Sequence, residues 1–288
     1  MGDFDEPFPG SWAVAAGRVS AWELRKDFER IHPDVYVRKG VQLDARGRAQ
    51  AAGHWAKGEG ILVDFSAAAM HGTRWLDDKP AEITLTNRAR PPQGILAYRD
   101  TIRADQVCTV NGFRCTIPAR TAFDLARRLE PKEAIEVLDA LCNAAGLEPK
   151  EVEYVAELLP RARGRTNLRN VLPYVDGGAE SIPETRTRLV LVQAGLPTPE
   201  TQIRILDPHG LTAARLDMGW RRWRVAVEYD GAHHWTDRNQ RSWDIDCAAA
   251  LESLGWILIR VSATLLTNRP HIIIERVERA LRSRNADL

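Results

Sequence analysis

The sequence is poor in cysteine and lysine and has no long apolar run. Its cysteines are scattered and form no Cys-x-x-Cys pair, which argues against a disulfide framework and a cysteine-based zinc site. No run of about 18 apolar residues exists, so we expect no transmembrane helix and no membrane partner. The acidic N-terminus lacks the basic and apolar regions of a secretory signal. We therefore expect a cytoplasmic protein.

The composition is otherwise typical of a folded protein. Hydrophobic residues make up 44% and charged residues 27% of the 288 residues. At about 100–200 residues per domain, this length predicts two domains. Basic and acidic residues nearly balance, 40 against 39, so net charge gives no argument for nucleic-acid binding. Beyond Lys150 the chain contains arginine but no lysine.

An arginine-rich stretch divides the chain. It contains Arg161, Arg163 and Arg165 and is followed by Gly177-Gly178, which is typical of a flexible connection. The arginines are either a solvated face of a linker or a strip that contacts the phosphates of DNA. Arg221 and Arg222, expected in a turn of the second half, are further candidates for DNA binding. Three parts are predicted, an N-terminal domain, a basic linker and a C-terminal domain, over residues 1–160, 161–180 and 181–288.

The first half predicts a mixed α+β domain. Ser20 and Glu23 have the spacing of a capping box that begins a short helix. Strands are expected over 34–38 and 83–86, and helices over 66–71, from Pro118, from Lys132 to Gly146 and over 149–159. The second half predicts the order α-β-β-β-α-β-α over residues 181–195, 202–206, 211–217, 223–230, 239–254, 256–261 and 270–284.

Three carboxylates of the second half are expected to converge. Glu228 and Asp230 share one strand face, because side chains alternate along a strand. Asp217 belongs to the preceding strand, and a hairpin would bring it beside Glu228. Like charges this close repel each other unless a cation or proton lies between them. A magnesium or manganese ion held there would polarise a phosphodiester and activate water, with the adjacent His233-His234 pair supplying a proton relay.

Each of these residues also has a structural explanation. Asp230-Gly231 could form a turn, and Asp217 could pair with a nearby arginine. Glu184 has the position that completes a capping box with Ser181. The His233-His234 pair could lie in a loop or ligate zinc together with a carboxylate, although adjacent histidines usually point apart.

Several motifs follow one another in the second half, namely Glu184, Asp217, Val227-Glu-Tyr-Asp-Gly231, His234, Asp244 and Leu251-Glu-Ser-Leu-Gly-Trp-Ile-Leu-Ile-Arg260. In order and spacing they resemble the DUF559 family, a branch of the Vsr-like endonucleases of the PD-(D/E)xK superfamily. The resemblance implies an α/β restriction-endonuclease-like domain with a mixed central sheet. It also implies metal ligation by Asp217 and Glu228, assistance by Asp230, proton handling by His234 and a place for Glu184 in the site. Asp230 stands where the superfamily usually has lysine.

The first half carries four further motifs, Asp34-Val-Tyr-Val37, Phe65-Ser-Ala-Ala-Ala-Met-His-Gly72, Ile83-Thr-Leu-Thr86 and Ile117-Pro-Ala-Arg-Thr-Ala-Phe-Asp-Leu-Ala126. They are similar to the AbiEi family of type IV antitoxins and transcriptional regulators. The resemblance implies promoter binding through a winged helix and a cognate toxin as partner. Here the winged helix would be reduced to one helix over 22–30 and a wing strand over 34–38. Lys26 and Arg30 would be its candidates for reaching base edges.

Two functions follow from these patterns. The first is a metal-dependent DNA endonuclease that its N-terminal half guides to DNA. The alternative is a non-catalytic DNA-binding regulator or antitoxin of a type IV toxin–antitoxin system, with a degenerate nuclease fold. A protein-interaction module without either activity is a third hypothesis. Adjacent carboxylates are costly to bury and repel phosphate, so a protein that only binds DNA gains nothing from them. A metal-dependent endonuclease needs them as ligands, and the carboxylates therefore favour the endonuclease.

Overall fold

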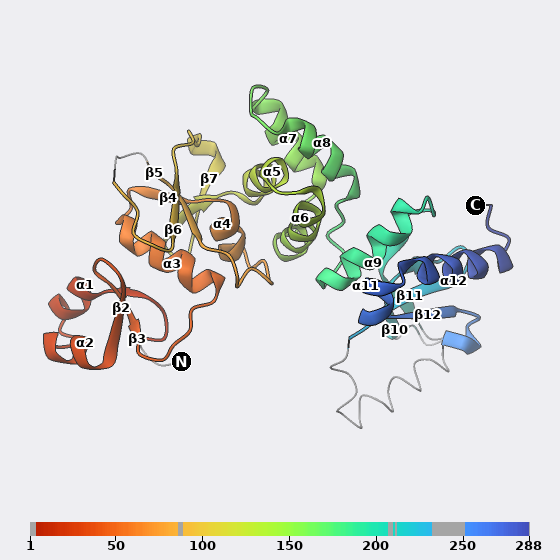
Figure 1. Ribbon diagram of the computed structural model, residues 1–288, viewed down its shortest axis with the longest axis horizontal. Coiled ribbons are helices and arrows are strands. Elements are labelled where there is room, and N and C mark those ends of the chain that lie inside the picture. The colour runs from red at the N-terminus through yellow and green to blue at the C-terminus, as the bar shows by residue number, and fades with distance from the viewer. Residues whose placement is uncertain (1–3, 86–88, 207–209, 211, 232–250, 288) are drawn as a thin grey trace. The chain divides into compact units, whose positions relative to one another are not determined.

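The computed structural model describes residues 4–85, 89–206, 210, 212–231 and 251–287. Contacts divide the chain into two compact units, Met1–Gly177 and Gly178–Leu288 (Figure 1). Both units mix helices and sheets, as expected. The boundary lies near the end of the stretch 161–180. No helix in the described ranges is long and apolar enough to cross a membrane.

The first unit begins with a small three-stranded antiparallel sheet and two short helices. Its elements are β1 (Phe8–Pro9), α1 (Gly10–Ala15), α2 (Ala21–Asp27), β2 (Phe28–His32) and β3 (Val35–Arg38), and the strand order is β1-β3-β2. The predicted capping box begins α2, since Ser20 Oγ accepts from the Glu23 amide and the Glu23 carboxylate accepts from the Ser20 amide. The prediction of one helix over 22–30 is wrong in two respects, because residues 28–30 belong to β2 and α1 precedes α2.

A five-stranded sheet forms the next layer of this unit. Its strands are β4 (Gly60–Leu62), β5 (Ala81–Leu85), β6 (Ile95–Tyr98), β7 (Val107–Val110) and β8 (Phe113–Thr116), in the order β6-β5-β4-β8-β7. A short 3-10 helix, η1 (Ala104–Gln106), precedes β7. Helices α3 (Ala45–Ala56) and α4 (Asp64–Met70) contact this sheet, and their small residues allow close packing (Figure 1). The shared core includes Ala49, Ala52, Leu62, Ala67, Met70, Ile83 and Cys115.

Four helices complete the first unit, α5 (Pro118–Arg128), α6 (Pro131–Ala145), α7 (Pro149–Leu158) and α8 (Arg165–Val171), and η2 (Leu172–Tyr174) follows them. A proline in the first turn of α5, α6 and α7 presets the helical backbone where no amide partner is needed. α8 occupies part of the predicted linker and packs on α5 and α6. It buries Leu168 and Val171. These two apolar residues have helical spacing, but they stand among arginines, which led to the prediction of a linker.

The second unit is built around a four-stranded mixed sheet, which confirms that part of the prediction. Its strands are β9 (Glu200–Leu206), β10 (Thr212–Trp220), β11 (Val225–Asp230) and β12 (Ile257–Ser262). The order is β12-β11-β10-β9, with antiparallel pairs except for the parallel pair of β11 and β12. Its helices are α9 (Ile182–Gln193), α11 (Ala263–Asn268) and α12 (Pro270–Ser283). Most of the helix expected over 239–254 lies outside the described residues.

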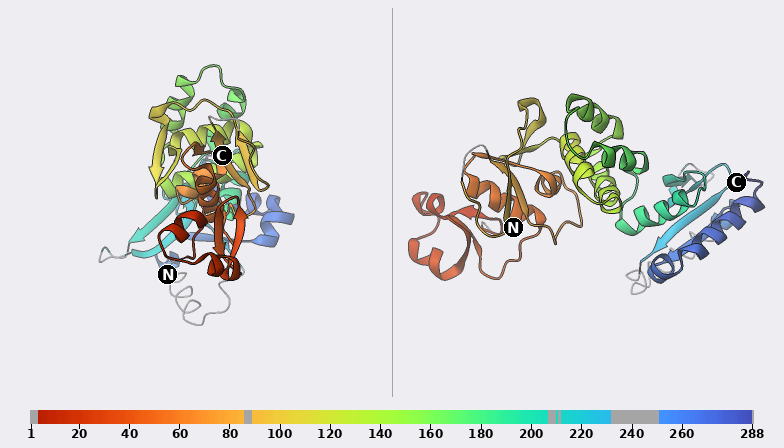
Figure 2. Two further views of the ribbon diagram at one scale, coloured as in Figure 1. Left: turned by 90° about the vertical axis from the view of Figure 1, so that its left-hand side faces the viewer. Right: turned by 45° about the horizontal axis from the view of Figure 1, so that its top comes forward.

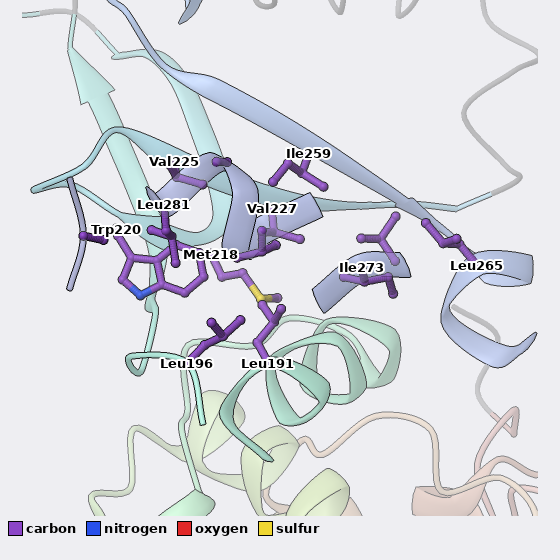
Figure 3. Packing of buried hydrophobic residues seen from close by; sticks show 14 residues of the cluster. Leu191, Leu196, Met218, Trp220, Val225, Val227, Ile259, Leu265, Ile273 and Leu281 are labelled. Atoms are coloured by element: carbon purple, nitrogen blue, oxygen red, sulfur yellow. The ribbon is translucent and has the colours of Figure 1, made fainter. Parts of the chain in front are cut away.

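Helices α9 and α12 bury one face of this sheet. Figure 3 shows Leu191 and Leu196 facing Met218 of β10, while Ile273 and Leu281 of α12 complete the same core. α12 runs along the strands, as the right-hand view of Figure 2 shows. Gly219 allows the tight β10–β11 pairing, because an added Cβ atom would lie 2.4 Å from the Val225 carbonyl oxygen.

Candidate functional site

Asp217 lies where β10 and β11 diverge. The two strands pair at Met218 and Val227, and one step further the Asp217 carboxylate, through Oδ2, accepts the Tyr229 amide at 2.8 Å. Burial and, to a smaller extent, the nearby Glu184 carboxylate raise the pKa of Asp217 to about 6. Asp217 therefore takes up a proton, or could exchange it for a cation, about one pH unit below neutrality.

Glu184 reaches the same place from the first turn of α9. Its carboxylate accepts hydrogen bonds from the Ser181 hydroxyl at 2.8 Å, the Glu180 amide at 2.9 Å and the Gln202 side-chain amide at 3.3 Å. The predicted capping box is present in part: Ser181 Oγ accepts the Glu184 amide at 3.3 Å, but the Glu184 carboxylate accepts the Glu180 amide and not the Ser181 amide. Glu184 nevertheless lies close enough to Asp217 to raise the pKa of that carboxyl.

Gln202, which the sequence did not indicate as a site residue, also contacts Glu184. It lies in β9 between the pairs Ile203–Leu216 and Thr201–Met218, at the level of Asp217. Its φ of 50° is in the left-handed region, which side chains with a Cβ atom rarely adopt. Backbone strain of this kind often accompanies functional sites. Glu184, Gln202 and Asp217 together form what we call the acidic cluster.

The remaining predicted metal ligands lie on β11. Glu228 and Asp230 are half-buried and pair in register with Arg260 and Ser262 of β12. Among the described residues, the group of three placed to hold a metal ion is His71, Cys108 and Cys115, not these carboxylates. A metal site at Asp217, Glu228 and Asp230 therefore stays a prediction. His234, the predicted proton relay, lies outside the described residues.

The five arginines predicted to bind DNA have different environments. Arg165 donates to the carbonyl oxygens of Ala156 and, at 2.9 Å, Leu159, so it closes the C-terminal end of α7. Arg221 pairs with Glu200 at 2.9 Å, and the Arg222 guanidinium lies 5.4 Å from the Trp223 ring centroid. The other two, Arg161 and Arg163, are exposed.

A buried ionic network lies within the first unit. Asp64 begins α4 with a φ of 47° and is 2% exposed. Burial raises its pKa to about 7, although the contacting Arg128 opposes this effect. Arg128 also contacts Asp100. The Asp64 Oδ1 atom has no hydrogen-bond partner in the part of the chain that the structure describes.

Neighbouring polar groups extend this network. Glu82 accepts the Tyr98 hydroxyl and the Phe65 amide, each at 2.8 Å, and burial raises its pKa. On α5, Arg120 and Asp124, four residues apart, form an ion pair at 2.7 Å with both side chains buried. Since these partners link α4, α5 and β5, we interpret the network as a structural element of the first unit.

Two short helices and a hairpin form a part of the first unit that exposes basic and aromatic side chains. Helices α1 and α2 are joined by residues 16–20, and β2 and β3 follow as the hairpin. On α2, Trp22 is 60% exposed and the Lys26 ammonium lies 4.4 Å from its ring centroid. Arg25 is exposed beside them. Lys39 donates to the Lys26 carbonyl at 2.6 Å, which ties the end of the hairpin to α2.

The hairpin is also fixed to α1. Asp34 forms its turn with a φ of 61°, and its carboxylate accepts the Ser11 amide at 2.8 Å. Arg30 and Arg38 are exposed on the two strands. Helix and hairpin thus present cations from one rigid support.

Comparison with known proteins identifies relatives over most of the chain. Residues 59–174 match the model of the AbiEi antitoxin C-terminal domain, which covers the five-stranded sheet and α5 to α8. The uncharacterized proteins MT2308 and Rv2248 of two Mycobacterium tuberculosis strains, CDC 1551 / Oshkosh and ATCC 25618 / H37Rv, are each 30% identical over 255 residues. The alignment covers 88% of this chain and 92% of each relative. The chain therefore belongs to the family of these mycobacterial proteins, and its residues 59–174 are similar to the AbiEi antitoxin C-terminal domain.

Proposed function

We propose that this protein is a DNA-binding regulator of the type IV antitoxin class, and that α2 and the β2–β3 hairpin contact DNA. The observation that carries the proposal is the exposed face of α2, where Trp22, Arg25 and Lys26 lie together on a helix that a hairpin follows. The order β1-α1-α2-β2-β3 is that of a winged helix without its first helix. The match to an antitoxin domain in the same chain supports this interpretation.

The roles of the side chains follow from their positions. In winged-helix and helix-turn-helix proteins the second helix enters the major groove, which makes Arg25 and Lys26 the candidates for base edges and phosphates. Arg30 and Arg38 of the hairpin would contact the backbone beside the groove. The near-neutral net charge does not oppose this, because the position of individual cations matters more to DNA contact than the total charge. A cognate toxin is the partner that an antitoxin domain would bind, and its contact surface would belong to residues 59–174.

The test is binding to DNA upstream of the protein's own gene, measured by fluorescence anisotropy at fixed salt. Arg25→Ala and Lys26→Ala are expected to weaken binding about tenfold each, which corresponds to about 1.4 kcal/mol. Lys132→Ala, an exposed lysine on α6, is the matched control and should leave the affinity unchanged. Equal binding by all three variants and the wild type would remove α2 from the interface.

A second candidate function is a metal-dependent DNA endonuclease of the DUF559 or PD-(D/E)xK type. The acidic cluster favours it, because a carboxyl with a raised pKa beside another carboxylate and a strained strand is typical of a cation site. Magnesium or manganese would bind at Asp217, Glu228 and Asp230. His234 and Glu184 would complete the site.

Plasmid cleavage in the presence of magnesium or manganese tests this candidate. Asp217→Asn and Glu228→Ala should abolish cleavage, whereas Glu200→Gln, which alters an exposed ion pair of the same sheet, should not. Calorimetry with millimolar magnesium should show heat for the wild type that Asp217→Asn loses. If the wild-type protein shows neither cleavage nor heat, the endonuclease is excluded and the regulator remains the proposed function.

A further inference from the structure

Three side chains that favour soft metal ions meet in the first unit. His71 follows α4, and Cys108 and Cys115 face each other in register across β7 and β8. The two Sγ atoms are 3.5 Å apart, and Cys115 Sγ is 4.0 Å from His71 Nε2. All three ligand atoms lie within 4.8 Å of one another.

We propose that His71, Cys108 and Cys115 bind a zinc ion. In a tetrahedral site with Zn–S of about 2.3 Å and Zn–N of about 2.0–2.1 Å, neighbouring ligand atoms are roughly 3.6–3.8 Å apart. The observed 3.5 Å and 4.0 Å bracket these values. An ion therefore fits between the three atoms with small side-chain adjustments.

Thiolate and imidazole are ligands that zinc prefers, and the set has no carboxylate oxygen to favour magnesium. The His71 ring would ligate through Nε2, the atom that lies 4.0 Å from Cys115 Sγ. The Thr116 carbonyl oxygen lies 2.7 Å from His71 Nε2 and 3.9 Å from Cys108 Sγ. His71 Nε2 now donates to this oxygen, so zinc would replace that hydrogen bond, and a water molecule would take the fourth position.

The zinc ion would have a structural role. It would join the end of α4 to the β7–β8 hairpin, two elements that now meet through these side chains and the His71–Thr116 hydrogen bond. Cys108 and His71 are half-buried, which gives the ion a route from solvent, while Cys115 is fully buried. The site is independent of the proposed DNA contacts, so either proposal can fail without the other.

The experiment uses the full chain, reduced and freed of metal, in a Cys247→Ser background, because Cys247 lies outside the described residues. Cobalt(II) replaces zinc as the probe, since thiolate ligation produces charge-transfer absorption in the near ultraviolet. One equivalent should bind with this absorption, and one equivalent of zinc should displace it. Zinc should also raise the melting temperature, because the ion binds the folded state.

Three variants make the test specific. Cys108→Ser and His71→Gln should each weaken zinc binding at least tenfold and remove the zinc-dependent rise in melting temperature. Cys142→Ser is the matched control, because Cys142 is also buried but belongs to α6, outside the group. Cys108 is half-buried, so Cys108→Ser should fold even where a change at Cys115 does not.

Several outcomes would overturn the proposal. They are no cobalt or zinc binding at one equivalent, unchanged affinity in Cys108→Ser, or unchanged affinity in His71→Gln, which would leave only a dithiol. A Cys108–Cys115 disulfide that forms in air despite equimolar zinc would also contradict it, since thiolates held by the ion would resist oxidation. Thiol titration distinguishes this last case from metal binding.

Discussion

Each unit contains a carboxyl group whose pKa is raised by burial. One of these groups has a cationic neighbour and the other an anionic one. Arg128 contacts Asp64 in the first unit, whereas Asp217 in the second lies near the Glu184 carboxylate. Even so, Asp64 has the higher pKa, about 7 against about 6. Asp64 is the more deeply buried of the two, so loss of hydration outweighs even a contacting guanidinium. Burial is the largest cause of the raised pKa in both groups, and the charged neighbours have smaller effects.

This difference separates a structural network from a candidate binding site. Asp64 is enclosed, and its hydrogen-bonding neighbours tie α4 to α5 and β5. Asp217 is half-buried beside an acidic partner, an arrangement that gains from a bound cation. The following predictions separate these two roles.

The largest effect is expected from Arg128→Ala. The change leaves the Asp64 carboxylate buried without its cation, and breaking such a pair costs about 3–5 kcal/mol. The loss of unfolding free energy in urea should be greatest at pH 8 and much smaller at pH 5, where Asp64 is protonated. Arg103→Ala, which breaks an exposed pair with Asp105, is the control and should cost less than about 1 kcal/mol at either pH. A loss that does not depend on pH would show that Arg128 acts through packing alone.

A smaller effect is expected from Asp64→Asn, measured as a change in the slope of the unfolding free energy against pH. The folded pKa of Asp64, about 7, lies above its ordinary value of 3.8. The folded state therefore holds a proton that the unfolded chain releases, so this group makes stability fall as pH rises from about 4 to about 7. The slope from one group is at most about 1.4 kcal/mol per pH unit. Asp64→Asn should remove this contribution, so that its stability relative to the wild type improves between pH 5 and pH 8. An unchanged difference across this range would mean that Asp64 is ionised throughout.

The sequence predicted the elements whose signals are local. Ser20 and Glu23 mark the start of α2, Pro118 and Gly146 bound the α5–α6 region, and the apolar pattern of residues 256–261 identifies β12. It did not predict α1, because Gly10 begins that helix and no side chain caps it. Arg165 was assigned to a linker because its two carbonyl partners on α7 are visible only in the fold.

The sites were harder to predict than the elements, since they join distant positions. Asp217 and Glu184 were expected from motif order, but the contact of Gln202 with Glu184 depends on the placement of β9 beside α9. The pair Cys108 and Cys115 has no local metal motif, and the missing ligand, His71, comes from another element. Contacts of this kind depend on strand register and helix placement, which residue patterns do not fix.

The smallest effect is expected from Glu184→Gln. Gln keeps the size and an acceptor oxygen at this helix position but removes the charge that raises the pKa of Asp217. The Asp217 pKa, followed by NMR of the side-chain carboxyl carbon, should therefore fall from about 6 while staying above its ordinary value of 3.8, because burial remains. Glu200→Gln, further along the same sheet, is the control and should leave it unchanged. If added magnesium lowers the Asp217 pKa in the wild type and not in Glu184→Gln, the acidic cluster acts as one cation site. An Asp217 pKa that does not respond to Glu184→Gln would mean that burial alone sets it, as it largely does for Asp64.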